Sequence, residues 1–241
     1  MPSKIRLYFS KEIKANLLSN LSTEQSHYIK NVMRLKPGDT IALFNSKNGE
    51  WSAKIVNHNK ESTEFKVEKL IKSKKLENDL WLAFSPIKKN PLDMMIQKTT
   101  ELGVQKFIPI LSERTIVKEI NTERLKKIIV EASEQSNRIS VPEIKNLEPL
   151  KYFLDRFPNE GSLIFCDINS NKSDLKNILE KKSQGPIGVL VGPEGDFSEK
   201  ERQLIIEKKE IFSLSLANNI LRAETAAIAS VTIVNYHLNF N

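Results

Sequence analysis

The hydrophobic pattern of the chain changes after its first third. Before Leu70, short apolar runs with partial alternation are separated by turn residues, and each run predicts a strand. These strands are Arg6–Phe9, Thr40–Phe44, Glu50–Val56 and Ser62–Leu70. Asn48-Gly49 is a strong hairpin signal, and Thr23–Val32 is expected to form a helix. Short strands at this spacing indicate a small β-barrel.

From Leu80 onward, apolar strands alternate with amphipathic helices. The expected strands are Leu80–Ser85, Phe107–Leu111, Leu163–Cys166, Ile187–Val191 and Ile211–Leu216. The expected helices are one capped by Asn90 and closed by Gly103, Thr122–Gln135, Ser173–Lys182, one entered through a Ser198/Glu201 capping box, and Ala223–Leu238. This alternation predicts an α/β domain with a parallel sheet and flanking helices.

The polar, charged segment Lys72–Asp79 has no periodicity and is interpreted as a linker. The sequence therefore predicts two domains, 1–72 and 79–241. Their charges differ. Residues 1–75 contain 15 Lys and Arg against 7 Asp and Glu, whereas residues 76–241 contain 22 against 23. All of the net charge of +7 thus comes from the first third, which favours a polyanion-binding module. A lysine-rich surface kept for solubility is the alternative.

Composition narrows the class of protein. With 241 residues, 39% hydrophobic and 28% charged, the chain has the make-up of a soluble globular protein. No apolar run has the length of a membrane span, and Met1–Phe9 lacks the apolar region of a signal peptide. A single cysteine allows no internal disulfide, so a cytoplasmic location is expected. One cysteine and three scattered histidines make a metal site unexpected.

The turn Gly192-Pro193-Glu194-Gly195 is the most informative local feature, because it joins a buried strand to a capped helix. Open α/β sheets bind ligands at the carboxyl ends of their strands, and this turn follows the carboxyl end of a predicted strand. Pro193 removes an amide donor, and Glu194 and Asp196 add negative charge, so the turn suits a neutral or cationic ligand better than a phosphate. An enzyme that holds a nucleotide phosphate here is disfavoured, since no Lys-Ser/Thr follows. An ordinary strand-to-helix turn is the structural alternative.

Five motifs in order make the chain resemble the RsmE-type bacterial 16S ribosomal RNA uridine-N3 methyltransferases of the knotted SPOUT superfamily. They are His27…Val32-Met33-Arg34…Gly38-Asp39, Lys98…Glu101-Leu102-Gly103-Val104…Pro109, Glu131–Arg138…Pro142, Leu190–Gly195 and Ile220–Ala226. The resemblance extends over nearly the whole chain. It departs at Asp196, where the family usually has a glycine.

The resemblance implies a PUA-like RNA-binding barrel followed by an α/β domain with a deep trefoil knot. It also implies S-adenosyl-L-methionine as cofactor, 16S rRNA or the small ribosomal subunit as partner, and a homodimer. The cofactor is expected among three loops, which supply Phe165, Gly192, Pro193, Glu194, Gly195, Leu216, Asn219, Ile220 and Leu221. A non-enzymatic RNA-binding protein with a degenerate enzyme domain is the alternative, disfavoured by the intact motifs.

Two arginines are candidate catalytic residues. Loss of the N3 proton leaves negative charge on the uracil, which a neighbouring cation stabilises. Arg222 follows the expected cofactor loop, and Arg138 follows Gln135-Ser136. Either could instead pair with a local carboxylate such as Glu194, Glu224 or Glu134. No residue stands out as general base.

The candidate RNA-binding residues lie in the basic first third, and they are Arg6, His27, Arg34 and Lys36. Solvated surface is the alternative for each of the last three. The apolar helix Ala223–Leu238 has few faces that suit solvent, so burial against a partner subunit is one reading and burial within its own domain the other. In the dimer reading, Arg138 or the Gln135-Ser136 turn is expected to complete the partner's pocket.

Overall fold

The computed structural model describes residues 5–74, 77–170 and 185–240. It divides into two compact units. The first contains Met1–Leu76 together with Ser133–Val141, and the second contains Glu77–Ala132 and Pro142–Asn241. The division between Leu76 and Glu77 falls inside the expected linker. The inclusion of residues 133–141 in the first unit has no signal in the sequence, because it depends on contacts between distant segments.

The first unit is built on a five-stranded sheet in the order β1-β3-β4-β5-β2. Its strands are β1 (Arg6–Tyr8), β2 (Leu18–Asn20), β3 (Thr40–Asn45), β4 (Gly49–His58) and β5 (Thr63–Lys72). β3 and β4 pair antiparallel through the predicted hairpin, where Gly49 has a φ of +83°. Phe9, Ile41, Leu43, Ile55 and Phe65 are among the side chains of its hydrophobic core. The predicted strands are confirmed, whereas β2 was not expected.

The helical segment of the first unit differs from the single helix expected over Thr23–Val32. α1 (Thr23–His27) begins with a capping box in which Ser22 and Gln25 satisfy each other's backbone amides. It continues as a π-helical turn, η1 (Tyr28–Val32). Arg34 follows with a φ of +54°, in the left-handed region that a side chain rarely adopts. π-helical turns are frequent at functional sites.

The second unit is built on a sheet in the order β12-β10-β11-β6-β7-β8, with every pair parallel. Its strands are β6 (Leu80–Phe84), β7 (Lys106–Leu111), β8 (Glu143–Ile144), β10 (Ser162–Cys166), β11 (Ile187–Val191) and β12 (Ile211–Leu214), and β9 (Glu148–Pro149) pairs with β7. The predicted parallel α/β architecture is confirmed. The strand predicted over Ile211–Leu216 ends two residues earlier, because its last residues enter a loop.

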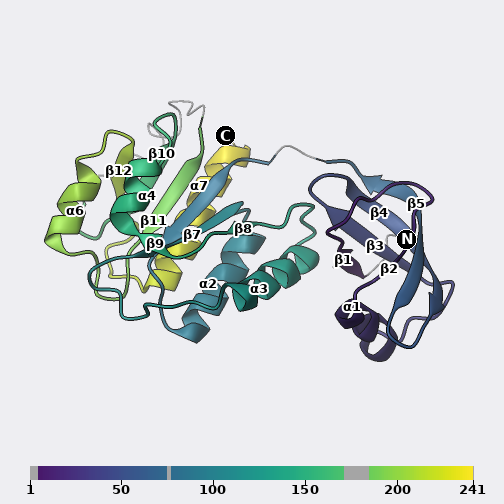
Figure 1. Cartoon of the computed structure of the whole chain (residues 1–241). Helices are drawn as coiled ribbons and strands as arrows, with labels where there is room; N and C mark the ends of the chain where they lie inside the picture. Colours follow the sequence, from purple (N-terminus) through teal and green to yellow (C-terminus); the bar gives the residue numbers. More distant parts are fainter. Residues whose placement is uncertain (1–4, 75–76, 171–184, 241) are drawn as a thin grey trace. The chain divides into compact units, whose positions relative to one another are not determined.

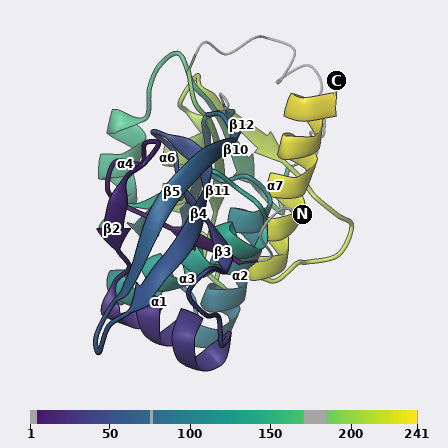
Figure 2. The ribbon, with the colours of Figure 1, turned by 90° about the vertical axis from the view of Figure 1, so that its right-hand side faces the viewer.

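Helices cover both faces of this sheet (Figure 1). α4 (Leu150–Arg156) and α6 (Glu199–Ile206) pack on one face, around Phe153, Phe157 and Ile205. α2 (Lys89–Glu101) and α7 (Ala223–Phe240) pack against each other, and α7 also contacts β11 and β6. Figure 2 shows α4 and α7 on opposite sides of the sheet. α3 (Thr122–Gln135) is joined to α2 by an ion pair between Arg124 and Asp93.

Two of the predictions for the helices are not confirmed by the described residues. α2 starts at Lys89, after an N-cap at Lys88 that makes no side-chain capping bond, so the cap predicted at Asn90 is wrong. The helix predicted over Ser173–Lys182 lies outside the described residues. Within the described part of the chain, no helix is both long and apolar enough to cross a membrane.

Candidate active site

Loops at the carboxyl ends of β10, β11 and β12 line two adjoining cavities in the second unit. The larger has a volume of about 670 Å³ and the smaller about 80 Å³. Their walls share Cys166, Ile168, Ile220, Leu221 and Ala226. The carboxyl edge of an open parallel sheet is the usual ligand site of this architecture. The two cavities therefore form a single candidate site.

The turn after β11, residues 192–196, forms one wall of the larger cavity. A Cβ on Gly192 would lie 3.1 Å from the ring of Phe197, so a side chain there would be crowded. The amide of Asp196 donates to the carbonyl of Pro193 at 3.0 Å and closes the turn. α6 then begins with the predicted capping box, in which Ser198 and Glu201 satisfy each other's backbone amides. Tight packing and the cap fix the backbone that faces the cavity.

Asp196 occupies the position where the resembling family usually has glycine, and its φ is +58°. Its carboxylate Oδ1 accepts a hydrogen bond from the amide of Phe197 at 2.8 Å. Aspartate is one of the few side chains that tolerate the left-handed region, because it bonds to nearby backbone. The departure from glycine therefore keeps the left-handed backbone of the turn.

We expect Asp196→Ala to lower the free energy of unfolding by about 1–2 kcal/mol, because alanine keeps the steric penalty and loses the hydrogen bond. Asp196→Gly should remain within about 1 kcal/mol of the natural chain, since glycine adopts this φ without strain. Urea unfolding followed by Trp81 fluorescence in a Trp51→Phe background measures both. Equal loss in the two variants would show that the backbone conformation is not the constraint.

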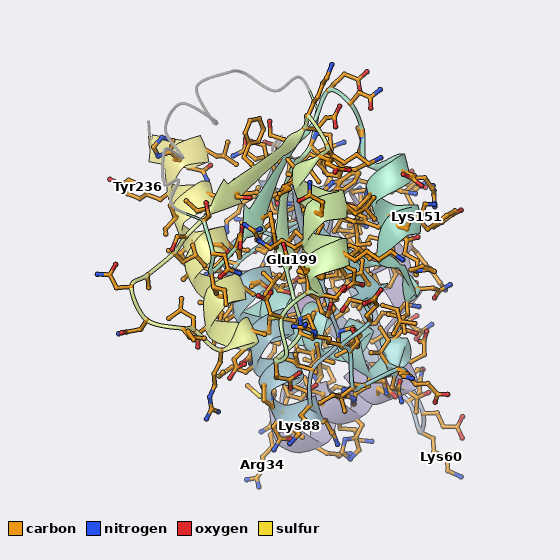
Figure 3. The ribbon with its side chains drawn as sticks, turned by 90° about the vertical axis from the view of Figure 1, so that its left-hand side faces the viewer. Arg34, Lys60, Lys88, Lys151, Glu199 and Tyr236 are labelled. Carbon is orange, nitrogen blue, oxygen red and sulfur yellow. The ribbon has the colours of Figure 1, made fainter. Side chains whose placement is uncertain are left out.

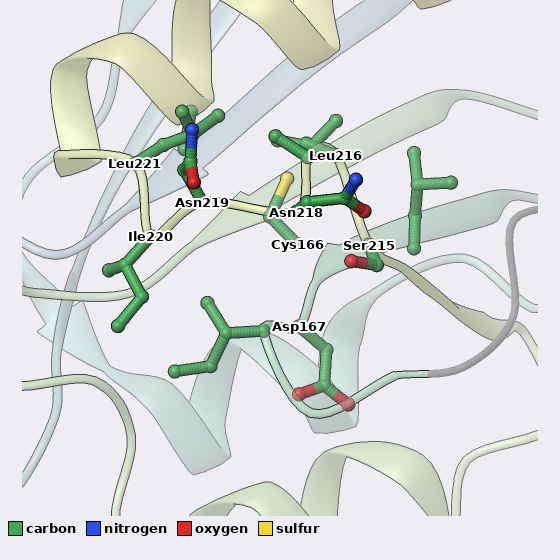
Figure 4. Close-up of a pocket in the computed structure, with 12 residues that line it drawn as sticks. Cys166, Asp167, Ser215, Leu216, Asn218, Asn219, Ile220 and Leu221 are labelled. Carbon is green, nitrogen blue, oxygen red and sulfur yellow. The ribbon is translucent and has the colours of Figure 1, made fainter.

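The loop after β12 closes the site on the other side (Figure 4). Leu216, Asn218 and Asn219 line the smaller cavity, and Ile220 and Leu221 line both. Ile220 is 82% exposed, which is unusual for an isoleucine. The loop thus offers apolar side chains and backbone groups to a ligand.

Arg222 follows this loop and lines the larger cavity together with Glu194 and Glu224. Its backbone carbonyl accepts the amide of Ala226 at 2.8 Å, in the first turn of α7. The side chain is exposed. Among the described residues it forms no ion pair with either glutamate. The alternative, in which Arg222 only pairs with one of these carboxylates, is therefore not supported. A guanidinium without a carboxylate partner in the described part of the chain therefore lies at the cavity.

Asp167 lies directly after β10 and lines the smaller cavity. Its side chain is 1% exposed and pairs with the guanidinium of Arg202 at 2.9 Å, and Arg202 lies on α6. This hydrogen bond raises the pKa of Arg202. The Asp167 carboxylate also accepts the amide of Asn169 at 2.9 Å. Sequence reasoning missed this pair because 35 residues separate its members and no motif marks them.

Phe165 is placed differently from the sequence expectation. It is 1% exposed, its ring centroid lies 5.6 Å from that of Phe197, and it lines neither cavity. Cys166 takes that position instead, because successive residues of a strand point to opposite faces. Burial raises the pKa of the Cys166 thiol to about 12, so it lines the wall as a neutral group. The other eight expected cofactor residues all line one or both cavities.

Two family models and a relative that aligns over nearly the full length match this chain. Residues 72–235 match the model of the RNA methyltransferase domain, and residues 21–68 match that of the RNA methyltransferase PUA domain. The ribosomal RNA small subunit methyltransferase E of Rickettsia conorii is 32% identical over 231 residues, which cover 95% of this chain and 94% of the relative.

The chain belongs to the ribosomal RNA small subunit methyltransferase E family.

Further relatives are similar to this chain over nearly its full length. The Aquifex aeolicus protein of this family is 30% identical over 95% of this chain and 99% of its own. The crystal structure of the Neisseria gonorrhoeae protein, described as bound to S-adenosyl methionine, superposes with a TM-score of 0.88 at 28% identity, covering 98% of this chain and 99% of that one. A Legionella pneumophila methyltransferase in complex with the same cofactor gives a TM-score of 0.85 at 28% identity, with 95% and 96% covered. The PUA-like and methyltransferase folds are thereby shown.

In this member of the methyltransferase E family, three expected RNA-binding residues lie within the PUA match. All three are exposed: His27 is the last residue of α1, and Arg34 and Lys36 lie in the loop that follows η1. Lys30 lies among them, and the exposed apolar side chains Tyr28, Val32 and Met33 alternate with the cations. Figure 3 shows Arg34 projecting outward from its unit. We call residues 27–36 the basic turn.

Arg6 does not belong to this surface, and its assignment to RNA is corrected. Its side chain is 7% exposed and pairs with Glu50 at 3.0 Å. The same guanidinium donates to the backbone carbonyls of Ser133, Glu134 and Arg138, at 3.1, 2.7 and 2.6 Å. It also lies 4.4 Å from the ring centroid of Phe44. These bonds use the charge inside the first unit and leave no exposed group for a phosphate.

Arg138 belongs to the first unit, with the segment that Arg6 holds. It is 9% exposed, and its guanidinium donates to the hydroxyl of Ser140 at 2.9 Å. A catalytic role for Arg138 stays a prediction. Among the described residues, no group of histidine, cysteine and acidic side chains is arranged to hold a metal ion.

Proposed function

We propose that this chain transfers a methyl group from S-adenosyl-L-methionine to N3 of a uridine in 16S ribosomal RNA. The observation that carries the proposal is the cavity built from the three family loops, lined by Arg222, which has no carboxylate partner within residues 5–74, 77–170 and 185–240. The names of the relatives support the ribosomal RNA of the small subunit as substrate. We infer that the protein works in the cytoplasm, where that RNA is found.

The residues of the cavity fit S-adenosyl-L-methionine. Leu216, Ile220 and Leu221 supply apolar contacts for an adenine ring. Glu194 and Asp196 place negative charge beside the cavity, which suits a ligand with a sulfonium cation. The bound cofactor described for the two solved relatives supports the same choice. When bound, S-adenosyl-L-methionine supplies a methyl group that is already activated.

The chemical work left to the protein is orientation and charge stabilisation. The fixed backbone of residues 192–196 and the Asp167–Arg202 pair hold the walls of the cavity in place. Arg222 lines the cavity, and its guanidinium would stabilise the negative charge that develops on the uracil when the N3 proton leaves. Ile220 and Ile168 give the cavity an apolar lining. Arg222 is therefore the proposed catalytic residue.

Methylation of small-subunit ribosomal RNA by the purified protein tests the function. Calorimetry with S-adenosyl-L-methionine tests the cofactor site separately. We expect binding of one cofactor per site and labelled methyl groups in 16S ribosomal RNA. Absence of cofactor binding would instead support a non-enzymatic RNA-binding protein.

We also propose that the basic turn binds RNA phosphates. Arg34→Gly removes one charge but suits the positive φ of this position, so it separates charge from folding. RNA affinity should fall on the order of five- to tenfold, and the slope of log affinity against log salt should decrease by about one. Fluorescence anisotropy across a salt series measures both.

Lys60→Ala is the matched control, because Lys60 is an exposed lysine of the same unit, in the loop between β4 and β5 (Figure 3). It also removes one charge, but it should leave the salt slope unchanged. Equal effects of the two variants would point to the net charge of the unit instead of a defined contact surface.

We further propose a homodimer and the trefoil knot implied by the family resemblance. α7 supports the dimer. Val231 and Val234 are buried within the unit, whereas Ile233 and Tyr236 are 41% and 59% exposed. Figure 3 shows Tyr236 pointing away from the unit. A second copy would cover this apolar strip.

Analytical ultracentrifugation tests the dimer. The natural chain should sediment as a dimer, and Ile233→Glu should sediment as a monomer, because a charge cannot be buried there without a partner. Ile206→Glu is the control, since Ile206 is 38% exposed on α6, across the sheet from α7. A monomeric natural chain with full activity would contradict the dimer.

A further inference from the structure

Several hydrogen bonds hold the loop after β7, residues 112–115, in place. The hydroxyls of Ser112 and Thr115 lie 2.7 Å apart, and Ser112 also bonds the hydroxyl of Ser85 at 3.1 Å. All three side chains are buried. The amide of Glu113 donates to the carboxylate of Glu201 at 2.8 Å, at the start of α6. The loop is thus tied to the end of β6 and to the capping box beside the candidate site.

Arg114 is the residue that this fixed loop presents to the site. Its Nη1 donates to the carbonyl of Gly195 at 3.0 Å. The backbone of Gly195 also lies close to the base of the Arg114 side chain. A Cβ added to Gly195 would be 3.6 Å from the Cβ of Arg114. Gly195 lines the larger cavity. The guanidinium therefore stands at the rim of the cofactor cavity, held in orientation by a backbone carbonyl.

Most of the hydrogen-bonding capacity of Arg114 remains available. The side chain is exposed, and within the described part of the chain it bonds to no carboxylate. Arginine carries five N–H donors in a rigid fork, and the bond to Gly195 uses only one of its nitrogens. Such a fork matches two oxygens of a phosphate. Ile116, 73% exposed in the same segment, adds an apolar surface for a ribose or base.

We propose that Arg114 binds a phosphate of the RNA substrate next to the nucleotide that is methylated. The proposal rests on the proposed function and deepens it, because it adds an RNA contact in the second unit, at the site itself. Arg114 recognises the phosphodiester backbone, and the carbonyl of Gly195 fixes its guanidinium for that contact. The contact positions the target nucleotide and takes no part in the chemical step.

The test is steady-state methylation by Arg114→Gln, with calorimetry for the cofactor. Glutamine keeps an N–H for the Gly195 carbonyl and loses the charge. KM for RNA should rise about tenfold and the salt slope should fall by about one, with kcat within about twofold. Cofactor affinity should stay unchanged. Lys118→Gln is the control, because Lys118 is exposed in the same connection and makes no hydrogen bond or ion pair with the described residues.

The outcomes separate the two proposals. If the natural chain methylates RNA and Arg114→Gln has an unchanged KM for RNA, the inference on Arg114 is wrong and the proposed function stands. A variant that binds the cofactor more weakly with unchanged RNA affinity also overturns it, since Arg114 would then only support the turn. If the natural chain does not methylate RNA at all, the proposed function itself fails.

Discussion

Arg222→Ala is expected to lower kcat for RNA methylation by about 10²- to 10³-fold, while the affinity for S-adenosyl-L-methionine changes by less than about twofold. The guanidinium lines the cavity and has no carboxylate partner among the described residues. It is thus available to stabilise charge on the uracil in the transition state, and removing such a group costs a factor of this size. Arg222→Lys should retain part of the rate, because the charge is kept and the geometry is lost.

Single-turnover kinetics with saturating cofactor measure this loss in the chemical step. Arg156→Ala is the matched control, since Arg156 is 63% exposed on α4 and lies 3.7 Å from Glu148. It should leave the rate unchanged. An Arg222→Ala variant whose loss lay entirely in cofactor affinity would show that Arg222 holds the cofactor and not the base.

Arg6→Met should lower the free energy of unfolding of the first unit by about 3–5 kcal/mol. The substitution leaves Glu50, whose side chain is 6% exposed, without its closest cation. Lys72 remains 3.6 Å away but is half exposed, so it compensates only in part. Removing one partner of a buried ion pair leaves a buried charge uncompensated, which is the costly case. The carbonyls of residues 133, 134 and 138 lose their shared donor as well.

Urea unfolding of the full chain, followed by Trp51 fluorescence in a Trp81→Phe background, reports on this unit, because Trp51 packs against its core. Lys14→Met is the control. Its pair with Glu12 is 3.7 Å apart with both side chains about two-thirds exposed, so the change should be within about 0.5 kcal/mol. The double variant Arg6→Met/Glu50→Gln should recover part of the loss. Equal unfolding of Arg6→Met and Lys14→Met would contradict the structural role of Arg6.

The parts of the fold that depend on local patterns were predictable from the sequence. The capping box of Ser198 and Glu201 needs residues three positions apart, and the hairpin at Asn48-Gly49 needs two neighbours. The parallel sheet follows from the alternation of apolar runs with amphipathic helices. β8, β9 and α4 were missed because two strands of two residues and a helix of seven are too short to establish a period.

The site was predictable only as far as the family motifs extend. They located the loops around the cavity, but they placed Phe165 where the alternation of β10 puts Cys166. Arg6 resembled a surface cation because the carbonyls that it binds are 127 to 132 residues away. The Asp167–Arg202 pair and the bond from Arg114 to Gly195 are likewise contacts between distant segments. Such contacts arise from the tertiary fold, which no local pattern encodes.

Mapping the modified nucleotides of 16S ribosomal RNA by mass spectrometry, in cells with and without the gene, tests the central claim most directly. The proposed function predicts one N3-methyluridine that disappears when the gene is deleted. It should return with the natural gene and not with the Arg222→Ala variant, expressed at the same level. Persistence of every N3-methyluridine in the deletion strain would contradict the assignment of this protein as the 16S ribosomal RNA uridine-N3 methyltransferase.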